Sequence, residues 1–181
     1  ANEVKKQIKT IKSTSWVRQN KQLGTAHAVK QALKSLRRGS IAVILYGDVP
    51  LVSYSTLNKL VNQAKKDSLA LLTFNKEIPH GYGRIVRKGK NAIDKIVEEK
   101  DASPSQKKIT EVNSGIMAVK TKYLSKLIPQ VKNNNAAKEF YLTDIVSLAN
   151  KSKINVKALM LKDNVEVLGA KPQSLLLRGG D

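Results

Sequence analysis

The sequence contains no cysteine among its 181 residues. Disulfides, thiolate metal sites and cysteine nucleophiles are therefore excluded. No stretch approaches the roughly 20 consecutive apolar residues that a membrane helix needs. The first residues, Ala1 to Lys6, also lack the apolar centre of a secretion signal. These absences predict a cytoplasmic protein in a reducing compartment, without a membrane partner.

Acidic residues are scarce relative to basic ones. Asp and Glu total 14 against 33 Lys and Arg, which gives a net charge of +19 and a pI near 10.1. This balance favours polyanionic partners, either nucleic acid or phosphorylated ligands. The basic residues are spread along the chain, and aromatic residues make up only 4% of it. Because single-strand binders interleave basic and aromatic side chains, a nucleic-acid partner is not expected, and a basic nucleic-acid-binding module is kept as the alternative.

Strand-like and helix-like segments alternate along the chain, without an internal repeat or a low-complexity linker. Continuous apolar runs at 41–46 and 69–74 indicate strands that are covered on both faces. Further strands are predicted at 15–17, 83–87, 92–98, 112–119 and 154–161, and helices at 2–12, 25–36, 55–65, 122–128 and 142–150. This alternation predicts a layered α/β domain over residues 1–181, with helices on both faces of the sheet.

Both ends of the sequence are abrupt for such a domain. A doubly wound sheet normally opens with a strand and a phosphate-binding turn, whereas this sequence opens on a polar, helix-like segment. The last residues, Leu175 to Asp181, form one apolar turn with nothing after it. We therefore expect a partial domain.

Asp48 follows the predicted strand at 41–46, within Tyr46-Gly47-Asp48-Val49-Pro50. A carboxylate at the carboxyl edge of a sheet is well placed to hold a Mg²⁺ ion that bridges substrate phosphates. The same residues also have the composition of an ordinary turn. Spacing alone favours the two interpretations equally.

Glycine-rich segments supply two more candidate ligand contacts. Gly24-Thr25 begins a predicted helix, where free N–H groups bind a phosphate or a base edge, or where the threonine simply caps the helix. Gly81-Tyr82-Gly83 lets backbone approach a ligand closely. His27 is expected to be a packed residue and His80 a loop residue. The sequence has no Ser-His-Asp arrangement, histidine metal cluster or Walker-type lysine loop.

Polar side chains also accompany the later elements. Glu98 and Asn113 lie in or beside predicted strands, where they can hydrogen-bond sugar hydroxyls. The run Glu98-Glu99-Lys100-Asp101 has the composition of a solvated charged surface as well. Thr143, which opens a helix after Glu139 and Tyr141, is a candidate N-cap.

Taken in order, seven blocks of the sequence resemble the uridylyltransferase domain of the bacterial N-acetylglucosamine-1-phosphate uridylyltransferases. These bifunctional enzymes make UDP-N-acetylglucosamine for peptidoglycan and lipopolysaccharide precursors. The resemblance covers residues 4–170 and keeps the family's order and approximate spacing. The blocks are Trp16-Val17-Arg18-Gln19, Gln22-Leu23-Gly24-Thr25-Ala26-His27-Ala28, Leu45-Tyr46-Gly47-Asp48-Val49-Pro50-Leu51, Gly81-Tyr82-Gly83-Arg84-Ile85, Ile96-Val97-Glu98-Glu99-Lys100-Asp101-Ala102, Glu111-Val112-Asn113-Ser114-Gly115-Ile116 and Glu139-Phe140-Tyr141-Leu142-Thr143-Asp144.

The resemblance implies a fold and a reaction. The fold is a Rossmann-like nucleotidyltransferase sandwich of three layers, with a mixed, mostly parallel sheet that is truncated at its N-terminus. The reaction transfers a uridylyl group from UTP to N-acetylglucosamine 1-phosphate, with Mg²⁺ as cofactor, and gives UDP-N-acetylglucosamine and pyrophosphate. In-line attack of this kind depends mainly on positioning and charge neutralisation. A related transferase for another sugar or base is the alternative within this class.

The resemblance also implies roles for single residues. Asp48 is implied as the catalytic residue and Mg²⁺ ligand. The implied substrate contacts are Gln19, Gly24 and Thr25 for the uracil, Tyr46 and Gly47 for the nucleotide and sugar, Gly83, Glu98 and Asn113 for the sugar or ribose, and Glu139, Tyr141 and Thr143 for the N-acetylglucosamine.

The sequence departs from the family in three respects. The Gly-rich, Arg-bearing loop that binds UTP phosphates does not precede Ala1, and no hexapeptide repeats of the acetyltransferase β-helix follow Asp163. Lys171 stands where the family has an Asn as second metal ligand, and a protonated lysine has no lone pair to offer Mg²⁺. We therefore expect a monomer with impaired activity, the rate falling on the order of 10²–10³ for each missing phosphate donor.

Overall fold

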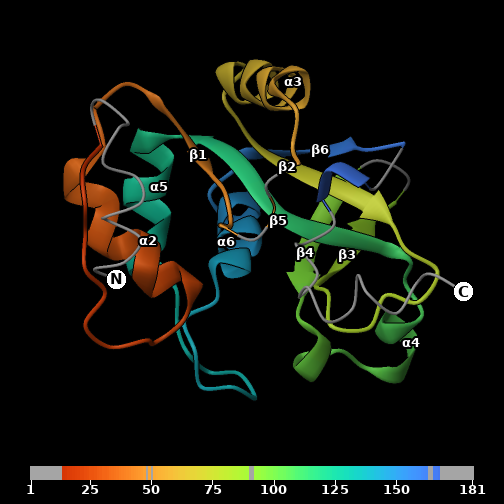
Figure 1. Cartoon of the computed structure of the whole chain (residues 1–181). Coiled ribbons are helices and arrows are strands. Elements are labelled where there is room, and N and C mark those ends of the chain that lie inside the picture. Colours follow the sequence, from red (N-terminus) through yellow and green to blue (C-terminus); the bar gives the residue numbers. More distant parts are fainter. Residues whose placement is uncertain (1–13, 48, 50, 90–91, 163–164, 168–181) are drawn as a thin grey trace, which may run out of the picture.

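The computed structural model describes residues 14–47, 49, 51–89, 92–162 and 165–167. In this part of the chain six strands form one sheet with the order β4-β3-β5-β2-β6, and β1 pairs with β5 outside that path (Figure 1). The strands are β1 (Ile41–Ile44), β2 (Ser68–Asn75), β3 (Arg84–Lys88), β4 (Ala92–Val97), β5 (Glu111–Lys120) and β6 (Asn155–Met160).

Helices cover both faces of this sheet. Alternate side chains of β2 point to opposite faces and pack into two separate apolar cores. Leu69 and Leu71 join one apolar core, which also contains residues of α2, α5 and α6. Ala70 and Leu72 join a second core with residues of α3. The three-layer α/β sandwich is therefore confirmed. The helices are α2 (Thr25–Ala32), α3 (Tyr54–Lys65), α4 (Pro104–Lys107), α5 (Thr121–Leu127) and α6 (Ile145–Lys151).

The sheet is mixed, as expected, but the strand directions correct the prediction of a mostly parallel one. Of the five pairings between described strands, only β2 with β6 is parallel. The apolar runs misled because they report burial on both faces and carry no information on direction. β5 illustrates this, since it is buried from Val112 to Val119 although all its neighbours run antiparallel to it.

One edge of β5 is shared by two strands, and this arrangement positions the candidate site. β1 pairs with the end of β5, from Ile44 opposite Met117 onward, whereas β3 meets its beginning, with Arg84 opposite Val112. The other edge belongs to β2, which also pairs with Met117 through Leu71. Between β1 and β3, residues 113–116 of β5 therefore have no strand beside them on this edge.

Several element boundaries differ from the prediction. The predicted helix at 2–12 lies outside the described residues, and residues 15–17 form no strand. The helix predicted at 25–36 ends at Ala32 and continues as a 3₁₀ turn, Leu33–Ser35. The helix predicted at 142–150 begins at Ile145, after the 3₁₀ turn Leu142–Asp144. Within the described ranges, no helix has the length and apolar character to cross a bilayer.

Candidate functional site

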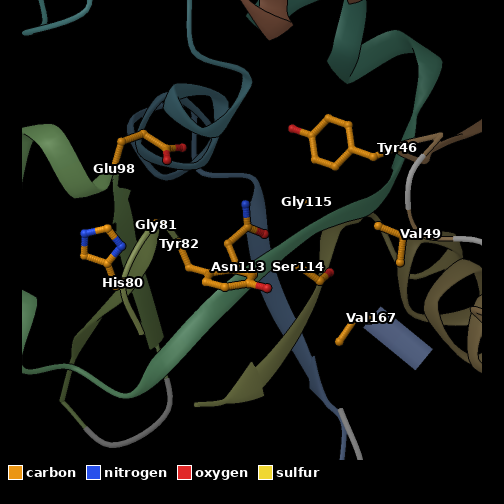
Figure 2. Close-up of a pocket in the computed structure, with 11 residues that line it drawn as sticks. Tyr46, Val49, His80, Gly81, Tyr82, Glu98, Asn113, Ser114, Gly115 and Val167 are labelled. Carbon is orange, nitrogen blue, oxygen red and sulfur yellow. The ribbon is translucent and has the colours of Figure 1, made fainter. Parts of the chain in front are cut away.

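A cavity of about 450 Å³ opens where β1 and β3 diverge along β5 (Figure 2). Its walls come from segments far apart in the sequence: the 80–83 loop before β3, Glu98 after β4, residues 113–115 of β5, and Tyr46 after β1. Val49 and Val167 complete it with apolar surface. The gap in strand pairing is thus lined by side chains and loop backbone.

One wall depends on glycine at position 115. Gly115 has φ +83, a conformation that other residues rarely adopt, and a β-carbon there would overlap the Tyr46 ring. Tyr46 therefore lies directly against the backbone of β5, which no larger residue at 115 would permit. This contact brings the segment after β1 to the cavity.

The opposite wall forms where the 80–83 loop lies against Glu98. The Asn113 backbone N–H donates to the Gly83 carbonyl at 2.9 Å, which fixes the loop to β5. A β-carbon on Gly83 would lie 3.3 Å from Glu98 Oε2 and 2.9 Å from a methyl carbon of Ile96. Glycine is therefore needed for the loop to come this close to the carboxylate.

Glu98 is held at the cavity by Thr143, whose hydroxyl donates to Glu98 Oε1 at 2.8 Å. Burial raises the pKa of Glu98, the Thr143 hydrogen bond opposes that shift, and the nearby charge of Asp101 adds to it. The pKa of Asp144 is raised for similar reasons, first by burial and then by Glu98 and Asp101. This part of a strongly basic protein therefore carries local negative charge, which suits neutral hydrogen-bond donors better than anions.

Asn113 supplies a second acceptor. The side chain is 8% exposed, and its buried Oδ1 has no hydrogen-bond partner within the described part of the chain. Figure 2 shows it between Glu98 and Tyr46. Because a buried polar atom without a partner is costly, an acceptor in a cavity wall indicates a ligand that donates a hydrogen bond there.

Four of the predicted site residues line this one cavity: Tyr46, Gly83, Glu98 and Asn113. Thr143 adjoins them through its hydrogen bond to Glu98. That bond also corrects the reading of Thr143 as an N-cap, because the residue lies within a 3₁₀ turn and its hydroxyl donates to a distant carboxylate.

Gln19, Gly24 and Thr25 form a second group that does not line the cavity, and Gly24 and Thr25 of this group contact residues 140–142. Gly24 has φ +113, and a β-carbon there would lie 2.6 Å from the Phe140 carbonyl oxygen. Gln19 Nε2 donates to the Gly24 carbonyl at 3.2 Å. The Thr25 hydroxyl accepts from the Leu142 N–H at 2.9 Å, so it does not cap its own helix.

Gly47, Glu139 and Tyr141 also lie outside the cavity lining. Gly47 and Glu139 are exposed, and Tyr141 is half-buried. Burial raises the pKa of Tyr141, with contributions from Asp101, Glu98 and Glu139. The tyrosine therefore stands at the edge of the same acidic region.

Asp48 and Lys171 lie outside the described residues. Within those residues, no group of three or more His, Cys, Asp or Glu side chains is arranged to hold a metal ion. The neighbours of Asp48 that are described, Tyr46 and Val49, do line the cavity.

The sequence analysis assigned no ligand-binding role to several residues that line the cavity. Gly115 carried a usable signal, since a glycine inside a predicted strand often marks a close approach of another segment. His80 was assigned to a loop, which is correct, but the loop forms part of the cavity wall. Val49 and Val167 carried no signal, because an apolar residue in a loop is common.

Comparison with known proteins matches residues 1–167 to the Nucleotidyl transferase family. Similar curated proteins include the "Bifunctional protein GlmU" of Nitrosospira multiformis, 52% identical over 145 residues, which are 80% of this chain and 32% of that protein. The proteins of the same name from Dechloromonas aromatica and Nitrosomonas eutropha are 50% and 48% identical over 155 residues, and cover 86% and 85% of this chain. The chain spans about a third of the length of these relatives, 34% of each of the latter two.

Proposed function

The chain belongs to the nucleotidyl transferase family, and on that premise we propose that it transfers a uridylyl group from UTP to N-acetylglucosamine 1-phosphate. The products are UDP-N-acetylglucosamine and pyrophosphate. The observation that carries the proposal is the convergence of Gly83, Glu98 and Asn113 on one cavity from three separate elements. Relatives that share 41–52% of their residues with this chain and bear the name GlmU support it.

The cavity has the chemistry that an N-acetylated sugar requires. Glu98 and the unpartnered Asn113 Oδ1 offer acceptors for sugar hydroxyls or the acetamido N–H. Gly83 leaves room for the ring, because glycine has no β-carbon or side chain that would project toward the carboxylate. The Tyr46 ring forms the facing wall on Gly115. The local negative charge then favours an orientation in which the phosphate points away from Glu98.

Members of the family generally use a divalent metal ion. We assign Mg²⁺ to this chain, with Asp48 as its ligand, on the resemblance of the Tyr46–Pro50 segment. When bound, such an ion neutralises charge on the UTP phosphates. Gln19, Gly24 and Thr25 are proposed for the uracil, in the group that packs beside the Thr143 segment.

The proposed setting follows from the reaction. UDP-N-acetylglucosamine is consumed in peptidoglycan and lipopolysaccharide synthesis, so we assign the chain to the cytoplasm. Its partners are then UTP and the sugar phosphate, and we propose that the 181-residue chain acts as a monomer.

Pyrophosphate release by the purified 181-residue chain tests the proposal. The assay contains UTP, Mg²⁺ and either N-acetylglucosamine 1-phosphate or glucose 1-phosphate, at high protein concentration because a slow rate is expected. Release should require both substrates, prefer the N-acetylated sugar, and disappear in Asp48→Asn. Asp67→Asn is the matched control, since Asp67 is an exposed carboxylate that pairs with Lys120, and neither residue lines the cavity.

Binding of UDP-N-acetylglucosamine, followed by amide chemical shifts, provides the second readout. Shifts should concentrate at residues 81–83, 98 and 113–115. The proposed function would be overturned if the chain showed no substrate-dependent pyrophosphate release and no saturable binding of UDP-N-acetylglucosamine at millimolar concentration. Equal pyrophosphate release with glucose 1-phosphate would instead indicate a related sugar nucleotidyltransferase.

A further inference from the structure

Arg84 is among the largest fully buried side chains of the described residues, at 2% exposure. It follows the 80–83 loop and begins β3. A buried guanidinium is unusual here, because no other Lys or Arg among the described residues is buried. Its position is also close to the cavity, because the residue before it, Gly83, lines the wall.

The Arg84 guanidinium connects three segments that are separate in the sequence. Its Nη1 donates to the carbonyl of Tyr82, in the loop of the cavity wall. Its Nη2 lies 2.6 Å from Glu99 Oε2 and 3.4 Å from the carbonyl oxygen of Lys107, at the end of α4. Glu99 directly follows Glu98, so the same side chain contacts the loop and the segment that carries the cavity carboxylate.

Glu99 strengthens this connection from its own side. The Arg84 guanidinium holds the pKa of Glu99 below its usual range, and His80 and the Gly81 amide act in the same direction. Both of those residues belong to the loop. The carboxylate thus interacts with the loop and with the arginine that holds it.

These contacts are poor for stability alone. Arg84 Nε is buried without a hydrogen-bond partner in the described structure, and the contact with Glu99 is an ion pair without good hydrogen-bond geometry at Oε2. Buried ion pairs are often no more stable than apolar residues of similar volume. An incompletely satisfied guanidinium directly behind the cavity-lining loop therefore calls for an explanation other than packing.

We infer that Arg84 is a positioning residue that sets the width of the sugar end of the cavity, by fixing the 80–83 loop relative to Glu98. The inference rests on the proposed function for the identity of the ligand. Arginine is required because its planar fork reaches the Tyr82 carbonyl and Glu99 together, whereas a lysine presents a single ammonium. Arg84 does not line the cavity itself and acts through Gly83 and Glu98.

The test compares the affinities of UDP-N-acetylglucosamine and UDP for the full chain and its variants, by amide chemical-shift titration. The difference between the two ligands isolates the contribution of the sugar. Arg84→Met should weaken UDP-N-acetylglucosamine binding by about tenfold or more, as expected for one misaligned charge-assisted hydrogen bond, and change UDP binding by less than about twofold. Arg84→Lys should show the same selectivity with a smaller loss.

Arg87→Met is the matched control. Arg87 lies on the same strand and forms a similarly close pair with Glu111, with both contacts at 2.7 Å, but neither residue lines the cavity. The control should lose stability without changing the ratio of the two affinities. A merely structural role for Arg84 would lower the folded fraction and leave that ratio unchanged, which would overturn the inference.

Amide hydrogen exchange separates this inference from the proposed function. In Arg84→Met, exchange at residues 81–83 and 98–101 should accelerate more than in Arg87→Met. If the native chain binds neither ligand, the proposed function fails and exchange alone decides on Arg84. Unchanged exchange at both segments would overturn the positioning role. Should Arg84→Met not fold, Arg84→Lys and Glu99→Gln provide the same comparison.

Discussion

The two halves of β5 differ in what lies along one edge. Residues 117–120 have β1 on this edge, and Met117 and Ala118 also pair with β2 on the other. Residues 117–119 are buried in the two apolar cores. Residues 113–116 have no strand on that edge, where residues 113–115 line the cavity between β1 and β3. On the other edge, a register shift interrupts the pairing with β2 between Met117 and Asn113. We call these the closed half and the open half of β5.

The comparison separates stability from binding within one strand. The closed half consists of apolar residues and Lys120, and it packs without leaving buried side-chain atoms unpartnered in the described structure. The open half contains Asn113, whose Oδ1 has no partner, and Gly115, which is held at positive φ. Features that cost stability are thus concentrated where a ligand can use them.

The largest effect is expected in the closed half. Met117 is 1% exposed and packs in the core with α5 and α6, so Met117→Ala should lower the free energy of unfolding by about 2–5 kcal/mol. The affinity for UDP-N-acetylglucosamine should change little at temperatures where the variant is folded. Urea denaturation and ligand titration measure the two quantities. If folded Met117→Ala lost much of its affinity for UDP-N-acetylglucosamine, the closed half would also serve binding, which contradicts the distinction between the two halves.

Gly115→Ala should affect both quantities. Its positive φ and the overlap with the Tyr46 ring should lower the free energy of unfolding by about 1–3 kcal/mol. Because Tyr46 must move, the affinity for UDP-N-acetylglucosamine should fall as well. Denaturation and titration of the same sample provide the measurement. Unchanged affinity would mean that the Tyr46 wall does not contact the ligand.

Asn113→Leu should separate binding from stability. The variant removes a buried acceptor that has no partner, so the free energy of unfolding should stay the same or rise by about 1 kcal/mol. UDP-N-acetylglucosamine binding should weaken by about tenfold, since one hydrogen bond to the ligand is lost. A variant that loses stability and keeps its affinity would show that Asn113 serves packing.

Glu98→Gln should change the free energy of unfolding least, and this change should be identifiable by its pH dependence. Because burial raises the pKa of Glu98 above 4.5, the folded state binds more protons than the unfolded state between 4.5 and the raised value. Stability therefore falls as the pH rises through this window, and the native chain carries the cost above it. The stability of Glu98→Gln minus that of the native chain should therefore be greater at pH 7 than at pH 4. The affinity of the variant for UDP-N-acetylglucosamine should fall.

Glu99→Gln is the control for that measurement, because its sign is opposite. The pKa of Glu99 is lowered, chiefly by Arg84, so this carboxylate stabilises the fold above 4.5 and loses its contribution as the pH falls through the lowered value. Glu99→Gln should therefore be less stable than the native chain at pH 7. Thermal unfolding of both variants from pH 4 to pH 8 measures the two stability changes. The electrostatic account would be contradicted if both variants were stabilised, or both destabilised, relative to the native chain as the pH rises.

The strands and layers followed from local sequence, whereas their directions and the cavity did not. Apolar runs such as 69–74 identify buried strands because burial on both faces leaves no polar positions. The run Glu98 to Asp101 shows the limit. Its composition indicated a solvated surface, yet Glu98 contacts Thr143 and Glu99 contacts Arg84. Those partners are distant in the sequence, and no local pattern identifies them.

A crystal structure of the chain with saturating UDP-N-acetylglucosamine tests the central claim most directly. The account predicts the N-acetylglucosamine ring beside the open half of β5, with its hydroxyl or acetamido donors within hydrogen-bond distance of the Glu98 carboxylate and Asn113 Oδ1. A sugar bound elsewhere, with these two acceptors facing only solvent, would contradict it.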